Sequence, residues 1–441
     1  MQNKLSYVWI AVLLFSIIAI GYVVEREESE WLIALFGLSF LAYFVLVVKP
    51  KRSLKEMLVI GILIRLSLLG ATPELSDDYY RFAFDGKMIV NGANPFTILP
   101  GQLEEKTAYE SKLVEEMNSP NYYTVYPPIN QIFFSLPTLI AGENLQVYVV
   151  LLRILIVLFE ILMALLLLKL LQYLNKELHL FAWYFLNPLV IIELTANLHF
   201  EGVTLFFFLL SMYLLMTGKL LRSGVVYAVA IGTKLIPLMF LPFFVHRLKV
   251  RSIWFFSVIG LTLFVLFVPF INKELISNIG SSIDLYFHTF MFNGSLFYLA
   301  NGVAEWFTGF EYNLNLLGSI TPGLVFVSVL LLSFSKNRSG WDGLFRQCLF
   351  GLMIYYALAS IVHPWYVINL MAVALFTNYR FPFVWSALNV LSYVAYGDQP
   401  VQEIPIVLLI EYLLLGSMIV YELLSERKNR LRLPGNKRDS F

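Results

Sequence analysis

Long apolar runs separated by short polar stretches make up most of the chain. A membrane-spanning helix needs about 20 apolar residues. Twelve runs come close to this length, at roughly 5–24, 31–48, 57–71, 145–171, 180–197, 202–217, 252–271, 315–335, 346–361, 365–378, 382–397 and 404–424. Three further apolar stretches are short or interrupted, at 127–141, 224–245 and 297–308. The pattern predicts an all-α, polytopic transmembrane helical bundle of about 12–14 membrane segments, with these three stretches as re-entrant or interfacial pieces.

The amino-acid composition excludes the common soluble classes. The 441 residues are 59% hydrophobic and 14% charged, against about 45–50% and about 25% in soluble domains. This excess rules out a soluble enzyme, a disordered chain and a disulfide-rich secreted module. The apolar runs also lack the alternation of membrane-barrel strands. The net charge of +1 argues against a nucleic-acid partner, and the single cysteine, Cys348, excludes disulfides within the chain and a cysteine metal cluster.

The basic residues predict how the chain is oriented. Lysine and arginine concentrate in cytoplasmic loops. With the loop 49–56 placed inside, most of the 31 basic residues fall on the cytoplasmic side and six on the other. We expect a multi-pass protein of the bacterial plasma membrane with both termini in the cytoplasm. The first run, Leu5–Val24, is followed by Glu25 and not by a small-residue cleavage site, so we expect a retained helix rather than a signal peptide.

This topology divides the chain into four parts. They are two N-terminal transmembrane helices (1–56), a transmembrane core with a long outer loop at 72–126 (57–251), the C-terminal transmembrane helices (252–424) and a basic cytoplasmic tail (425–441). Loops as long as 72–126 are usually functional or disordered. Its aromatic residues make the composition unlike that of a disordered segment. We therefore expect short helices lying at the membrane surface.

The first candidate site opens this outer loop, where Asp77 and Asp78 follow Ser76 directly after an apolar run. Adjacent carboxylates can bind a metal, or one can act as a base while the other tunes it. Arg81, one helical turn after Asp77, can pair with a carboxylate or bind a phosphate. The alternative is an ordinary acidic helix start, because Ser and Asp favour N-caps.

His199 and Glu201 form a second candidate between two apolar runs. Such a pair can relay protons or bind metal, although no third ligand follows at a metal spacing, so no zinc site is predicted. The alternative is a polar connection between helices. His363, before Pro364-Trp-Tyr366, lies at another outer boundary. The alternative for this group is an aromatic belt beside a helix-starting proline.

Lys234 lies inside an apolar stretch, between Gly232 and Pro237. A charge in such a place is costly and is a functional hypothesis by default. A broken helix with a cation suits an anionic group reaching in from the lipid, such as a phosphate. The alternative is a lysine that snorkels to the interface.

Six of these polar residues share the non-cytoplasmic face in a topology derived from basic residues alone. If they were scattered structural residues, about half should lie inside. They are Asp77, Asp78, Tyr126, His199, Glu201 and His363.

The motifs resemble the GT-C class of integral-membrane glycosyltransferases, and within it the mannosyltransferases that depend on polyprenyl-phosphate mannose. The resemblance spans roughly residues 57–370, with the first two runs as an addition before the core. It is carried, in chain order, by 76–87 (SDDYYRFAFDGK), 91–96 (NGANPF), Tyr126-Pro-Pro, Asn187-Pro, His199 with Glu201, Lys234-x-x-Pro237 and His363-Pro-Trp-Tyr366.

The resemblance implies a fold of GT-C type and the transfer of a hexose, mannose, from a polyprenyl-phosphate donor to an acceptor hydroxyl outside, with inversion. Asp77 or Asp78 would be the base, and the spacing to Tyr80 and Asp85 favours Asp77. Arg81 and Lys234 would hold the lipid phosphate. The other residues that would bind substrate are Tyr80, Asp85, Tyr126, His199, Glu201, His363, Trp365 and Tyr366.

The implied partners are the donor, membrane lipids and an acceptor that is a glycolipid, a cell-envelope glycan or a protein. Neither a Gly-x-Gly-x-x-Gly after a strand nor a P-loop occurs, and the sequence requires no cofactor. If a divalent metal takes part, Asp77 and Asp78 are its candidate ligands. The alternatives are transfer of another lipid-linked sugar and a lipid-linked glycan transporter or flippase. A transporter would need polar residues running to both faces, whereas the intramembrane charges are few: Arg65, Arg153, Glu160, Glu193, Lys234 and Glu411.

Overall fold

The structure, a computed structural model, describes residues 2–48, 52–288, 290–309, 314–335, 339–397 and 401–432. Within these ranges the regular elements are helices, with one isolated parallel bridge between Phe292 and Ile361. The predicted all-α class is therefore confirmed. Lys49 and Lys51 of the basic loop, and the part of the predicted tail after residue 432, lie outside the described residues.

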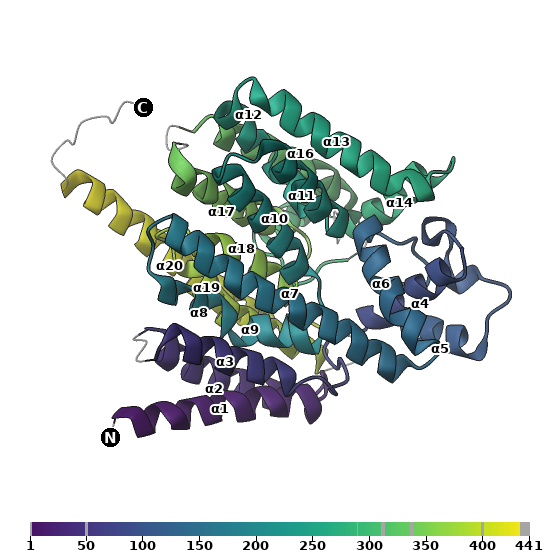
Figure 1. Cartoon of the computed structure of the whole chain (residues 1–441), viewed down its shortest axis with the longest axis horizontal. Helices are drawn as coiled ribbons and strands as arrows, with labels where there is room; N and C mark the ends of the chain where they lie inside the picture. The colour runs from purple at the N-terminus through teal and green to yellow at the C-terminus, as the bar shows by residue number, and fades with distance from the viewer. Residues whose placement is uncertain are drawn as a thin grey trace.

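Three N-terminal helices line one edge of the bundle (Figure 1). They are α1 (Gln2–Tyr22), α2 (Ser29–Val48) and α3 (Leu54–Leu66). α3 begins with a capping box, because Ser53 and Glu56 each accept the other's backbone N–H. Near its other end the buried Arg65 pairs with the buried Glu160 and donates to the carbonyl of Phe185 at 2.9 Å. A buried charge needs this kind of compensation, and the contacts join α3 to the core.

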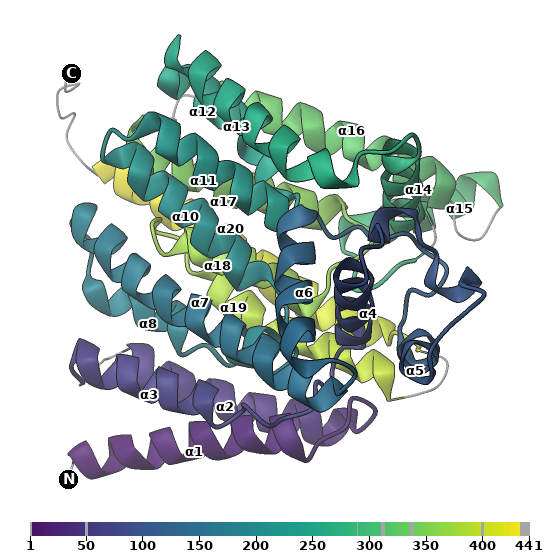
Figure 2. The same cartoon turned by 45° about the vertical axis from the view of Figure 1, so that its right-hand side comes forward.

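The outer loop folds into short helices at one end of the bundle (Figure 2). They are α4 (Asp78–Val90), η1 (Pro95–Thr97), η2 (Pro100–Gln102) and α5 (Ala108–Glu116), followed by α6 (Pro128–Ala141). α4 approaches α6 so closely that a Cβ on Gly86 would lie 2.3 Å from the carbonyl oxygen of Phe134. The rings of Phe82 and Phe134 stack at 4.4 Å. This packing fixes the start of α4, which carries the acidic pair.

A bent segment follows the long helix α7 (Leu145–Tyr173). Its parts are η3 (Leu178–Leu180), α8 (Phe181–Phe185), α9 (Pro188–Val190) and the π-helix η4 (Ile191–Ala196). The two halves are bent by 54°, so the apolar run predicted as a span at 180–197 is a broken helix pair. Pro188 has no amide hydrogen to continue a helix, and the Asn187 side chain accepts from the N–H groups of Leu189 and Val190 instead.

Arg153 of α7 stabilises the end of this bent segment. Its guanidinium donates to the carbonyls of Thr195 at 2.8 Å, Ala196 at 2.9 Å and Leu69 at 2.7 Å. Carbonyls at a helix end lack partners within the helix, so the arginine satisfies them inside the bundle. The residues after Ala196, which include His199, are held in place as a result.

The chain turns back near Lys234. The elements here are α10 (Glu201–Met216), α11 (Leu220–Thr233), η5 (Ile236–Phe240), α12 (Pro242–Leu248) and α13 (Arg251–Phe267). The hydroxyl of Tyr227 donates to the carbonyl of Pro237 at 2.7 Å, so the segment after Lys234 folds back against α11. This arrangement fits the interrupted, re-entrant piece that the sequence predicts for 224–245.

The C-terminal half completes the bundle. Its elements are η6 (Val268–Phe270), α14 (Leu275–His288), α15 (Leu296–Thr308), α16 (Leu314–Ser333), α17 (Gly340–Leu358), η7 (Pro364–Tyr366), α18 (Val367–Ala374), α19 (Phe381–Leu388), η8 (Asn389–Tyr396) and α20 (Pro405–Arg432). α13, α14 and α16 lie at the edge opposite α1–α3 in both views. The sequence did not predict α14.

By length and composition, five helices of the described part could cross a membrane, or six if the bent pair is one span. Shorter apolar helices stand where further spans were predicted, including Glu201–Met216, Pro364–Ala374 and Phe381–Tyr396. The chain therefore has the several apolar helices of a multi-pass membrane protein, although many are shorter than a complete span.

Candidate active site

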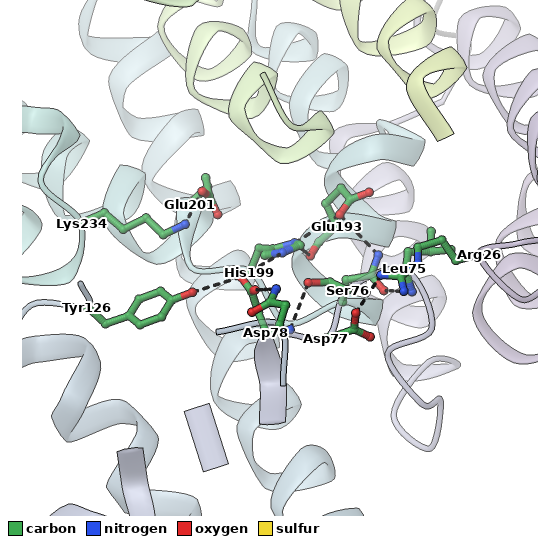
Figure 3. A network of polar contacts seen from close by, with 12 residues as sticks. Arg26, Leu75, Ser76, Asp77, Asp78, Tyr126, Glu193, His199, Glu201 and Lys234 are labelled. Atoms are coloured by element: carbon green, nitrogen blue, oxygen red, sulfur yellow. Dashed lines mark hydrogen bonds and ion pairs between the residues drawn. The ribbon is translucent and has the colours of Figure 1, made fainter. Parts of the chain in front are cut away.

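The two neighbouring aspartates face different partners (Figure 3). Asp77 precedes α4 but makes no side-chain cap hydrogen bond, so N-capping does not explain it. Its Oδ2 accepts from Nη1 of Arg26 at 3.0 Å, and the guanidinium of Arg26 lies 4.9 Å from the ring centroid of Tyr396. The charge of Asp77 is therefore compensated by a residue of the loop between α1 and α2.

Asp78 faces the opposite group of residues. Its Oδ2 accepts from the hydroxyl of Tyr126 at 3.1 Å, and its Oδ1 accepts from the Asn118 side chain at 2.9 Å. The same Oδ2 lies 3.9 Å from Nε2 of His199. Burial, together with the Asp78 carboxylate, raises the pKa of Tyr126 well above its usual value. Tyr126 therefore keeps its proton and donates a hydrogen bond to Asp78.

His199 lies in a stack of three rings. Trp365 packs on it with ring centroids 3.9 Å apart at 22°, and His363 packs on Trp365 at 4.3 Å and 11°. Tyr366 meets His363 edge-on at 5.5 Å. The structure thus brings the His199 motif and the His363 motif to one place beside Asp78, although 164 positions separate His199 from His363.

Lys234 pairs with Glu201 at the end of α11. The Glu201 side chain is 2% exposed, and its Oε2 is buried without a hydrogen-bond partner in the described part of the chain. The Lys234 side chain is 22% exposed. One cation and one carboxylate from different motifs are therefore neutralised together, which lowers the cost of placing either charge in an apolar stretch.

Arg81 and Asp85, both predicted to bind substrate, are turned into the protein. Nε of Arg81 donates to Asp85 at 2.8 Å, and Nη1 donates to the carbonyls of Ser119 at 3.0 Å and Tyr122 at 2.8 Å. Arg81 is 3% exposed. The pair fixes the loop that carries Tyr126 and Asn118. Tyr80, a further predicted site residue, stacks on Tyr79 at 4.1 Å.

Three residues of the cluster were not foreseen as site residues. Asn118 and Arg26 contact the aspartates through the fold alone, and no local pattern marks them. The sequence marks Glu193 only as one of the few intramembrane charges, yet its Oε2 lies 3.2 Å from Nδ1 of His199. The six-residue spacing does not match an α-helical face. The usable signal is the cost of an acid in an apolar run.

The described residues contain no group of three or more His, Cys, Asp or Glu side chains that could hold a metal ion. Asp77 and Asp78, the candidate ligands, turn to different partners.

Comparison with known proteins identifies the family. The family model "alpha-(1->6)-mannopyranosyltransferase, N-terminal domain" matches residues 14–249, more than half of the chain. GPI mannosyltransferase 1 of the yeast Kluyveromyces lactis is 27% identical over 193 residues, which cover 42% of this chain and 40% of the yeast protein. The chain thus matches less than half the length of this curated relative. None of the solved structures matches the chain. The chain belongs to the alpha-(1->6)-mannopyranosyltransferase family, a family of glycosyltransferases, in agreement with the motifs of its sequence.

Proposed function

We propose that the protein transfers a mannosyl residue from a polyprenyl-phosphate donor to an acceptor hydroxyl, with inversion, and that Asp78 is the base. The observation that carries the proposal is the position of the Asp78 carboxylate, which contacts Tyr126 and lies 3.9 Å from His199. A base must lie within reach of the proton that it removes. The family membership supports mannose as the sugar.

Asp78 suits the role better than Asp77. The oxygens of Asp78 accept from the neutral donors Tyr126 and Asn118, and among the described residues no lysine or arginine pairs with it. Asp77 is bound to the guanidinium of Arg26, so its carboxylate is already engaged in an ion pair. The structure therefore favours Asp78, whereas the spacing to Tyr80 and Asp85 favours Asp77.

Lys234 is the proposed contact for the donor phosphate. When the bond from the anomeric carbon to the phosphate oxygen breaks, the phosphate gains a negative charge. The attraction between the phosphate and a cation beside it is therefore stronger in the transition state than in the ground state. Glu201 holds the ammonium in position. Arg81, whose donors are taken by Asp85 and two carbonyls, is proposed to position the loop instead.

The remaining motif residues line the same place. His199, Glu201, His363, Trp365 and Tyr366 are proposed to bind the sugar or the acceptor, which is a glycolipid, a glycan or a protein. We propose that this site opens on the non-cytoplasmic side of a bacterial plasma membrane, because basic residues concentrate in the loops of the other side.

The structure gives little support to a transport pathway. The buried charges pair at short range, Arg65 with Glu160 and Lys234 with Glu201, while Arg153 binds backbone carbonyls. A lipid-linked glycan transporter would need polar side chains that continue to both faces.

The test is transfer by the purified protein in lipid nanodiscs. Polyprenyl-phosphate mannose, glucose and an aminosugar analogue are offered separately with a pool of short mannosides and membrane lipids, and the products are analysed by mass spectrometry. We expect a mannosylated product of inverted configuration and free polyprenyl phosphate from the mannose donor alone. Absence of transfer from every donor, with the folded protein verified, would contradict the proposal.

A further inference from the structure

Glu193 is a buried carboxylate that the proposed function leaves without a role. It lies on η4 and is 0% exposed. Its Oε1 accepts from the hydroxyl of Tyr393, and its Oε2 lies 3.2 Å from Nδ1 of His199. A buried acid is costly unless hydrogen bonds or an opposite charge compensate it. In the described part of the chain its ion-pair partner is His199, which lies beside the proposed base.

Glu193 holds His199 in one tautomer. Nδ1 of the ring lies 3.1 Å from the backbone carbonyl oxygen of Glu193, as well as close to the carboxylate of the same residue. A carbonyl oxygen only accepts hydrogen bonds, so Nδ1 carries a hydrogen. In the neutral ring Nε2 is then the unprotonated nitrogen and can accept a proton.

Nε2 is directed at the proposed base. It is buried without a hydrogen-bond partner in the described structure and lies 3.9 Å from Oδ2 of Asp78. Trp365, stacked on the ring at 3.9 Å, keeps it from swinging away. Catalytic hydrogen bonds are often long before substrate binds and tighten in the complex. The charged and titratable groups around the ring are Asp78, Glu193, His363 behind Trp365, and the Lys234–Glu201 pair.

We propose that Glu193 is a positioning residue that makes His199 the acceptor of the proton that Asp78 removes. This inference rests on the proposed glycosyl transfer. The acceptor oxygen bonds to the anomeric carbon while the bond from that carbon to the phosphate oxygen breaks and its electron pair stays on the phosphate. The hydroxyl proton passes to Oδ2 of Asp78 and on to Nε2 of His199. Asp78 is again a carboxylate, and Glu193 balances the imidazolium until the proton returns to water.

The arrangement gives the base a nearby group to which it can pass the proton. An aspartate that kept the proton could not act in the next turnover, and 20% of the Asp78 side chain is exposed, against 1% of His199. A neighbouring imidazole removes the proton over a short distance. The carboxylate of Glu193 lies 3.2 Å from the other ring nitrogen and offsets the charge that the ring gains.

The first test compares Glu193→Gln with Tyr393→Phe. Glutamine keeps the size and one oxygen of Glu193 but removes the charge, whereas phenylalanine removes a hydrogen bond from the same carboxylate and keeps its charge. For Glu193→Gln we expect kcat to fall on the order of 10²-fold, as for loss of an acid–base group, with an unchanged KM for the donor. We expect this loss when kcat is measured per folded molecule. Tyr393→Phe should keep most of the wild-type kcat, because the carboxylate beside His199 keeps its charge.

The second test is a double-mutant cycle with His199→Gln. If Glu193 acts through His199, the variant that carries both substitutions should be no slower than His199→Gln alone. Losses that multiply would overturn the relay. So would a Glu193→Gln enzyme that keeps the wild-type kcat per folded molecule, since a merely structural residue lowers the folded fraction and the thermal stability without lowering that kcat. A wild-type protein inactive with every donor would instead overturn the proposed function together with the relay.

Discussion

Arg26 donates a hydrogen bond to Asp77 at 3.0 Å, and this contact leaves the adjacent Asp78 as the carboxylate that faces Tyr126. Successive residues of a helix point about 100° apart, so two neighbouring acids at a helix start reach different partners. In the proposed function the two acids have different roles, a structural one for Asp77 and a chemical one for Asp78.

The two aspartates should therefore differ when each loses its charge. Asp78→Asn should lower kcat by about 10²–10⁴-fold, the usual contribution of a positioned base. Asp77→Asn breaks a partly exposed ion pair that is worth at most about 1 kcal/mol, and should cost much less activity. Initial rates with polyprenyl-phosphate mannose measure both effects. An Asp77→Asn enzyme slower than Asp78→Asn would reverse the assignment.

Lys234 should determine how well the donor is bound. Lys234→Ala removes a charge-assisted contact of about 1.5–3 kcal/mol, so we expect the kcat/KM for the donor to fall at least about tenfold, through a lower kcat as well as a higher KM, while the KM for the acceptor stays constant. Lys234→Arg keeps the positive charge and should recover part of the loss. An unchanged kcat/KM for the donor in the alanine variant would exclude the phosphate contact.

Gly86 should be required for the packing of α4 on α6. In Gly86→Ala the new Cβ would lie 2.3 Å from the Phe134 carbonyl oxygen, and overpacking of this kind costs about 1–3 kcal/mol. The matched control is Gly37→Ala in α2, where a Cβ meets nothing within 4 Å and should stabilise the helix by up to about 1 kcal/mol. Thermal unfolding in detergent compares the two. Equal midpoints would contradict the close approach.

Breaking the Arg65–Glu160 pair should destabilise the protein, whereas replacing both residues with apolar ones should cost little stability. Arg65→Met leaves the carboxylate of Glu160 buried and unpaired, which costs about 3–5 kcal/mol. Arg65→Met with Glu160→Leu removes both charges and should recover most of that loss. Denaturant unfolding of the two variants tests the difference. A single variant as stable as the double would show that Glu160 does not depend on Arg65.

Local sequence was sufficient for the fold class and for the motifs of the site. Transfer from water to lipid favours apolar side chains one by one, so runs of them predict helices without knowledge of their neighbours. The same reasoning predicted a broken helix around Lys234, between Gly232 and Pro237, where the chain does fold back. It did not predict the bend within 180–197, where Asn187 and Pro188 interrupt the helix.

The sequence by itself thus determined an all-helical membrane protein and the acids, histidines and lysine of its candidate site. Only the tertiary structure decided that Arg26 compensates Asp77, that Arg81 turns inward to Asp85, and that Glu193 lies against His199. The physical reason is that the role of a buried charge depends on the partner that tertiary packing places beside it. Arg26 and Asp77 are 51 positions apart, and no local sequence pattern between them predicts their contact.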